Sequence, residues 1–124
     1  MDLWKVSRAN NLKVYAMTNK FPKEELYGLT SQLRRSIVSV SSNIAEGSGY
    51  ESDHQFLRFL QMAMGSLCEA ESQIILAYDL KYVSKEDLEA SDEHLTNQKR
   101  LIYGMIRKLK HNIKQTAAPN SNQK

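Results

Sequence analysis

The fold is decided by two stretches of sequence, LRRSIVSVSSNIAEG at residues 33–47 and FLRFLQMAMGSLCE at residues 56–69. In and around each stretch, apolar or small residues recur at alternating steps of three and four, which is typical of an amphipathic helix with one buried face. The first stripe consists of Leu26, Thr30, Leu33, Ile37, Val40 and Ile44, and the second of Phe56, Leu60, Ala63, Leu67, Ala70, Ile74 and Ala77. Two neighbouring core helices are therefore predicted.

Proline, glycine and N-cap residues indicate where these helices begin and end. The earlier helix should begin near Pro22 to Glu25, since proline suits a first helical turn, and end at Gly47 and Gly49 in a left-handed C-terminal cap. The later helix should begin after Ser52, where a capping-box pattern opens it, and continue to about Leu80.

A further helix is predicted on each side of this pair. One covers about residues 2–19 and ends before Pro22, because proline cannot continue the helical hydrogen bonds. The other begins after Ser84, and its core positions recur every seven residues: Leu88, Leu95, Ile102 and Leu109. The prediction is an all-α, up-down-up-down four-helix bundle over residues 1–115, with a flexible polar tail at 116–124. A helical hairpin that completes its core only on dimerisation is the alternative.

Composition limits the class of protein. A chain of 124 residues with 41% hydrophobic and 25% charged residues is sufficient for one globular domain. Cys68 is the single cysteine, so no intrachain disulfide is possible, and we expect it to be a small buried side chain. Without an apolar leader or membrane span, the expected location is the cytoplasm, with no membrane partner.

Charge is distributed unevenly along the chain. Residues 1–93 hold ten Lys/Arg and fourteen Asp/Glu, a net −4, whereas residues 94–124 hold seven Lys/Arg and no acid, a net +7. One helical stripe in the basic part consists of Arg100, Tyr103, Arg107, Lys110 and Lys114. Cations with an interleaved tyrosine suit phosphate contact and base stacking, so this stripe is a candidate nucleic-acid-binding surface. The alternative is a solvated helix face.

Three further sets of residues are candidates for a role. Arg34 and Arg35 form a second basic site, which is either a phosphate site or, as we favour, part of an ion pair within the helix or between subunits. Asn43 and Glu46 indicate either a polar site or, more simply, hydrogen bonds that close the end of a helix. Trp4, an amphipathic aromatic on the first helix, is the candidate oligomer contact.

No catalytic constellation is found. The Glu-x-x-His spacing of Glu51 and His54 occurs once, whereas di-iron bundles need it on two helices. The acids Glu86, Glu89 and Glu93 favour the positive end of a helix and are expected to be solvated. We therefore expect no enzyme activity, no metal and no cofactor, and no small-molecule substrate is identified.

The order and spacing of several motifs resemble those of the 23S rRNA intervening-sequence proteins, often called the S23 ribosomal protein family. The resemblance covers about residues 1–110. Its motifs are Phe21 to Glu25, then Leu29, Gln32, Arg34 and Arg35, then Asn43 to Gly47, then Phe59, Leu60, Ala63, Gly65, Ser66, Leu67 and Glu69. Two positions depart from the family pattern: Tyr50 stands where many members carry arginine, and Ser41 where many carry proline. The first departure weakens the case for a basic turn that binds an anion.

The resemblance implies a left-handed four-helix bundle that assembles as a ring-like homopentamer, with Asn43, Glu46, Gly47 and Gly65 in structural roles. The accessory proteins of diversity-generating retroelements are similar, and they bind RNA and a reverse transcriptase through a basic surface. The resulting hypothesis is a non-enzymatic homo-oligomer that binds structured RNA, related to 23S rRNA or to a mobile element, or an RNA–protein complex. The alternative is a protein-interaction scaffold with no nucleic-acid contact.

Overall fold

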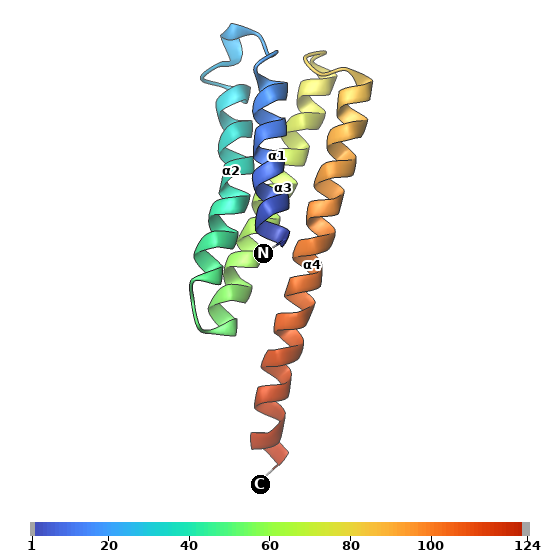
Figure 1. Ribbon diagram of the computed structural model, residues 1–124. Helices are drawn as coiled ribbons and strands as arrows, with labels where there is room; N and C mark the ends of the chain where they lie inside the picture. Colours follow the sequence, from blue (N-terminus) through green and yellow to red (C-terminus); the bar gives the residue numbers. More distant parts are fainter. Residues whose placement is uncertain (1, 123–124) are drawn as a thin grey trace.

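The computed structural model describes residues 2–122 and contains four α-helices joined by short connections (Figure 1). The helices are α1 (Asp2–Thr18), α2 (Leu29–Ser48), α3 (Asp53–Asp79) and α4 (Lys85–Asn122), and one turn of 3-10 helix, η1, covers Lys23–Glu25. Successive helices run in opposite directions, and no strand occurs within residues 2–122. The predicted all-α four-helix bundle is confirmed. Within the same residues, no helix is both long enough and apolar enough to cross a membrane.

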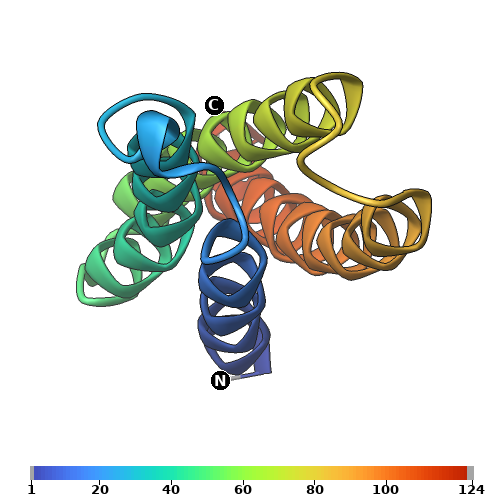
Figure 2. The same ribbon diagram turned by 90° about the horizontal axis from the view of Figure 1, so that it is seen from above.

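Each helix packs against two neighbours, and the view from above shows the four helices around one core (Figure 2). The contact between α2 and α3 is the most extensive, and that between α1 and α4 is the least. The largest fully buried apolar side chains come from α2, α3 and α4: Leu33, Ile37, Val40, Ile44, Leu60, Leu67, Ile74 and Ile102. These are the residues of the predicted stripes, so the core is completed within a single chain.

The start of α2 differs from the prediction. The helix begins at Leu29, and Leu26, expected in the core, is 48% exposed in the connection that follows η1. Gly28 interrupts the helical backbone with φ −113° and ψ −114°. Glu25 stabilises the delayed start, because its Oε1 accepts a hydrogen bond from the Leu29 N–H at 3.2 Å and its Oε2 accepts one from the Tyr82 hydroxyl at 2.9 Å.

The predicted left-handed glycine cap of α2 is wrong. Within residues 2–122 no glycine has a positive φ, and Gly47 lies in the last turn of the helix. A Cβ at Gly47 would lie 2.7 Å from the Phe59 Cβ. Glycine is therefore required here for the close approach of α2 to α3.

The left-handed cap occurs instead at the end of α3. Lys81 has φ 69° and is the one described non-glycine residue with a positive φ. The Tyr82 N–H donates to the Ala77 carbonyl at 2.8 Å, and the Lys81 N–H donates to the Tyr78 carbonyl at 2.9 Å. This pair of bonds is a Schellman motif, with lysine at the position that glycine usually occupies.

The inner face of α1 is partly polar, which the sequence did not reveal. Ser7 and Asn10 are buried there with Leu3 and Val14, whereas the apolar Leu12 is 72% exposed. The two polar side chains meet the fully buried Gln98 of α4. Hydrogen bonds between buried side chains therefore replace part of the apolar contact between α1 and α4.

The far end of α4 projects beyond the other three helices (Figure 1). The helix continues to Asn122, so residues 116–122 extend it past the predicted bundle boundary at 115. The flexibility of the 116–124 segment stays a prediction.

Candidate nucleic-acid interface

The basic stripe of α4 lies on the outward face of the helix. All five members of the stripe are exposed, namely Arg100, Tyr103, Arg107, Lys110 and Lys114. Tyr103 is 50% exposed. The opposite face of the same segment is buried through Ile102, Ile106 and Leu109. From Arg100 to Lys114 the stripe spans about 21 Å at the usual helical rise. It therefore presents a line of cations and one aromatic ring to solvent.

Within residues 2–122 no ion pair joins a member of this stripe to an acidic side chain. The ion pairs among the described residues are Lys20–Asp87 and Lys99–Glu71, which leave the stripe residues unpaired with carboxylates. Arg100 donates a hydrogen bond to Oδ1 of the neutral Asn97 one turn earlier. Lys108 is exposed beside the stripe and adds to its positive potential, and His111 is exposed next to it. Neither residue was predictable from the pattern of the stripe, because both fall outside its three-four repeat.

Arg34 contacts uncharged partners, and it forms no ion pair within the described chain; an ion pair between subunits stays a prediction. Its Nε donates to Thr18 Oγ1 at 2.8 Å, its Nη2 donates to Asn19 Oδ1 at 2.9 Å, and its guanidinium lies 4.6 Å from the centroid of the Tyr15 ring. These contacts tie α2 to the C-terminal end of α1, where a cation is favoured by the helix dipole. They also use several of the donors that a phosphate would need.

Arg35 lies on the exposed outer face of α2. It lines an open groove of about 650 Å³ together with Leu26, Tyr27 and Val38, and Tyr27 is 93% exposed. This groove is the second basic and aromatic surface of the molecule.

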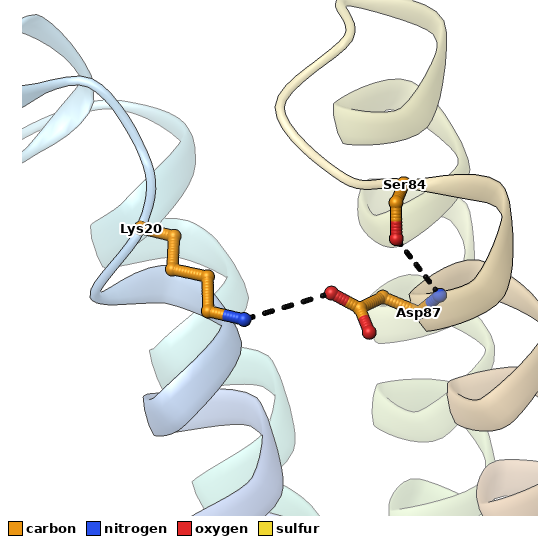
Figure 3. A network of polar contacts seen from close by, with 3 residues as sticks. All are labelled: Lys20, Ser84 and Asp87. Carbon is orange, nitrogen blue, oxygen red and sulfur yellow. Dashed lines mark hydrogen bonds and ion pairs between the residues drawn. The ribbon is translucent and has the colours of Figure 1, made fainter.

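The structure separates Arg34 and Arg35 from the α4 stripe. At the end of α1, Lys20 Nζ faces Asp87 Oδ2 in the first turn of α4 at 3.7 Å, and Ser84 caps that turn by accepting a hydrogen bond from the Asp87 N–H at 3.1 Å (Figure 3). Arg107 follows Asp87 by twenty residues, which is about 30 Å of helix. The two predicted basic regions therefore lie toward opposite ends of the bundle.

Asn43 belongs to a line of polar contacts between α2 and α3. Its Nδ2 donates to the Ser39 carbonyl at 2.9 Å and to Ser39 Oγ at 3.1 Å. Ser39 Oγ in turn lies 2.9 Å from Ser66 Oγ, and Ser36 Oγ donates to Glu69 Oε1 at 2.9 Å. These motif residues act in helix packing, since small hydroxyl side chains permit a close approach and still satisfy one another.

Two other motif residues, Glu46 and Gly65, face solvent. Glu46 is exposed, and a Cβ at the exposed Gly65 would meet no atom within 4 Å, so neither residue packs against another helix. Trp4 is 37% exposed, and the Arg8 guanidinium lies 5.3 Å from its ring centroid.

Cys68 is exposed on α3, so the prediction that it is buried is wrong.

The described residues offer no metal centre. Glu51 and His54 are both exposed, and residues 2–122 contain no group of three or more His, Cys, Asp or Glu side chains placed to hold an ion.

The shorter of the two ion pairs among the described residues joins α3 and α4. Lys99 Nζ lies 2.7 Å from Glu71 Oε1, and both side chains are less than one-third exposed. This hydrogen bond raises the pKa of Lys99 above its ordinary value, although partial burial acts in the opposite direction. The hydrogen bond to Glu25 likewise raises the pKa of Tyr82, with burial adding to the effect.

Comparison with known proteins supports the resemblance seen in the motifs. A crystal structure described as a protein with unknown function from the S23 ribosomal protein family of Bacteroides thetaiotaomicron has the same fold, with a TM-score of 0.78. The two chains are 20% identical, and the match covers 84% of this chain and 97% of that chain. No curated protein matches the sequence. The family model for the 23S rRNA-intervening sequence protein matches residues 1–104, and the chain therefore belongs to this family.

Proposed function

We propose that this protein is a non-enzymatic homo-oligomer, pentameric in its assembled form, that binds structured RNA or an RNA–protein complex through the basic stripe of α4. The observation that carries the proposal is the stripe itself: four cations and Tyr103 are exposed on one helix face, in a part of the chain without any acid. The family description supports a link to 23S rRNA genes. The RNA itself is either related to 23S rRNA or encoded by a mobile element.

The spacing of the stripe supports contact with the RNA backbone. Cations three or four residues apart on a helix form a line along one side, and each can neutralise one phosphate and release its counterions. Tyr103 lies between Arg100 and Arg107 and offers a half-exposed ring on which an unpaired base can stack. The surface therefore suits an RNA that combines a duplex with an unpaired loop or end.

The test is RNA binding by the full chain, measured by fluorescence anisotropy with a labelled hairpin over a range of salt concentrations. In the Arg107→Glu/Lys110→Glu variant, affinity should fall more than tenfold and the slope of log K against log salt should decrease by about one for each lost phosphate contact. The matched control is Lys5→Glu/Lys23→Glu, which makes the same charge change at two exposed positions outside the stripe.

Two results would contradict the RNA proposal: binding that does not change with salt, or equal losses of affinity in the stripe variant and the control variant. Tyr103→Ala and Tyr103→Phe separate stacking from charge. The alanine should weaken binding by about 1–3 kcal/mol, whereas the phenylalanine keeps the ring and should bind like wild type.

A protein-interaction scaffold is the second candidate function. The observation that favours it is the exposed row of acids at the start of α4, Glu86, Glu89 and Glu93, which is complementary in charge to the stripe of another copy. Light scattering after chromatography, with and without nuclease, distinguishes the two functions. An oligomer that never carries nucleic acid and dissociates at high salt favours the scaffold. Trp4→Ala tests the predicted oligomer contact in the same measurement.

A further inference from the structure

A groove separates α1 from the first half of α4. Its volume is about 280 Å³, and its inner wall is formed by the apolar side chains of Val14, Met17 and Leu95. The groove exists because the facing outer positions are small, namely Ala16 on α1 and Ala90 on α4. Side chains of this size leave space between two helices that a leucine would fill.

Two contacts bridge the groove, one near each end. Lys13 Nζ lies 3.2 Å from His94 Nδ1, and Lys20 Nζ lies 3.7 Å from Asp87 Oδ2 (Figure 3 shows the second bridge). Asp87 and His94 are seven residues apart on α4, which is about 10 Å, and Lys13 and Lys20 have the same spacing along α1 and the turn that follows it. The space between the bridges is therefore short, apolar inside and polar at both ends.

The two ends differ in charge. Lys20 is paired with a carboxylate, whereas Lys13 has no carboxylate within ion-pair distance among residues 2–122. The Lys13 ammonium carries three donors, and the contact with His94 uses one of them. An uncompensated cation with free donors thus lies at the edge of an apolar groove. This arrangement is complementary to an anion that carries an apolar body.

We propose that the groove binds a small amphipathic carboxylate, with the carboxylate at Lys13 and the apolar body along Val14, Met17 and Leu95. Asp87 repels an anion at the opposite end and so sets the orientation. The volume corresponds to about nine water-sized groups at ~30 Å³ each, which is the size of a ligand with eight to ten non-hydrogen atoms. This inference does not rest on the RNA proposal, since the groove and the α4 stripe share no residue.

Octanoate, titrated into the isotope-labelled full chain and followed by amide chemical shifts, is the first probe. Saturable shifts are expected at residues 13–20 and 87–95, with a dissociation constant on the order of millimolar. Octylammonium has the same chain with the opposite charge, and it should bind about tenfold more weakly or worse. Equal affinity for the two probes, shifts spread over other surfaces, or no saturation would overturn the proposal.

Three variants complete the test, each checked for an unchanged unfolding midpoint. Lys13→Met keeps the aliphatic stem and should weaken octanoate binding about fivefold. Ala90→Leu fills the groove and should abolish binding. Lys23→Met removes an exposed cation outside the groove and should bind like wild type. If Lys13→Met binds octanoate as tightly as Lys23→Met does, the carboxylate site is not at Lys13 and the proposal fails.

Discussion

Asn10 Nδ2 lies 2.6 Å from Gln98 Oε1, and both side chains are buried between α1 and α4. Gln98 Nε2 donates to Ser7 Oγ at 2.8 Å, and Ser7 Oγ donates to the Leu3 carbonyl at 2.8 Å. Three polar side chains in the core are thus joined by hydrogen bonds between two helices. Asn10 and Gln98 are 88 residues apart in the sequence. Because a shift of either helix would leave these groups unpaired, the network fixes the register of α1 against α4.

Gln98→Leu should lower the free energy of unfolding by about 1–3 kcal/mol, because it removes two buried hydrogen bonds and leaves Asn10 with only its longer bond to the His94 carbonyl at 3.3 Å. Adding Asn10→Leu should recover part of the loss, because it removes a buried amide that has lost its shorter hydrogen bond. Urea unfolding of the single and double variants measures both effects. Thr96→Leu, at an exposed position of the same helix, is the control, and a loss in Gln98→Leu no greater than in this control would contradict the role of the network.

Gly47→Ala should destabilise the fold by about 1–3 kcal/mol, since the new methyl group would collide with Phe59 at 2.7 Å and with Phe56 at 3.0 Å. Gly65→Ala is the matched helical control. Its Cβ meets nothing within 4 Å, so the better helix propensity of alanine should raise stability by up to about 1 kcal/mol. Thermal unfolding of the two variants should move the midpoint in opposite directions, and a shift in the same direction would refute the packing role of Gly47.

Lys81→Gly should stabilise the protein by about 0.5–1 kcal/mol, because glycine adopts the left-handed φ of 69° without the strain that a Cβ causes. Lys81→Ala removes the same charge and keeps the Cβ, so it should give no such gain. Denaturant unfolding at one pH distinguishes the variants. Equal gains in both would assign the effect to charge rather than to backbone strain.

Stability should fall at alkaline pH through two hydrogen-bonded groups. The pKa values of Lys99 and Tyr82 are both raised by hydrogen bonds to carboxylates in the folded state, so the unfolded chain loses these protons at a lower pH than the folded chain. Their contribution is complete below their ordinary pKa values of about 10 and is lost as pH rises through the folded values. The difference in unfolding free energy between wild type and Lys99→Met should therefore be constant from about pH 7 to 9.5 and shrink above about pH 10. A difference that grows above pH 10 would contradict this sign.

The stripes of α2, α3 and α4 were predictable because each helix keeps its apolar period over many turns, and a long period outweighs local irregularity. The polar inner face of α1 was not predictable, because Ser7 and Asn10 are acceptable in the core only when they bond to Gln98, which is far away in the sequence. The role of Gly47 depended in the same way on the approach of Phe59. Such long-range contacts leave no local pattern in a sequence.

In the candidate interface, too, features of a single helix were predictable and contacts between helices were not. The outward direction of the α4 stripe follows from the geometry of one helix, since the stripe lies opposite Ile102, Ile106 and Leu109. The position of Arg34 depends on Tyr15, Thr18 and Asn19 of another helix, so its neighbours were not predictable from α2 alone. Sequence reasoning also missed the cation at Lys13, because the groove beneath it forms only when α1 lies against α4.

The projection of α4 beyond the other helices makes the molecule an electric dipole. Residues 1–93 contain all the acidic residues and have a net charge of −4. Residues 94–124 contain no acid, have a net charge of +7 and include the projecting end of α4. A polyanion that comes within about one Debye length, ~8 Å at physiological ionic strength, acts on this separation of charge before any contact forms. The torque turns the positive end toward the polyanion and the acidic body away from it, so the orientation of the encounter is decided during diffusion.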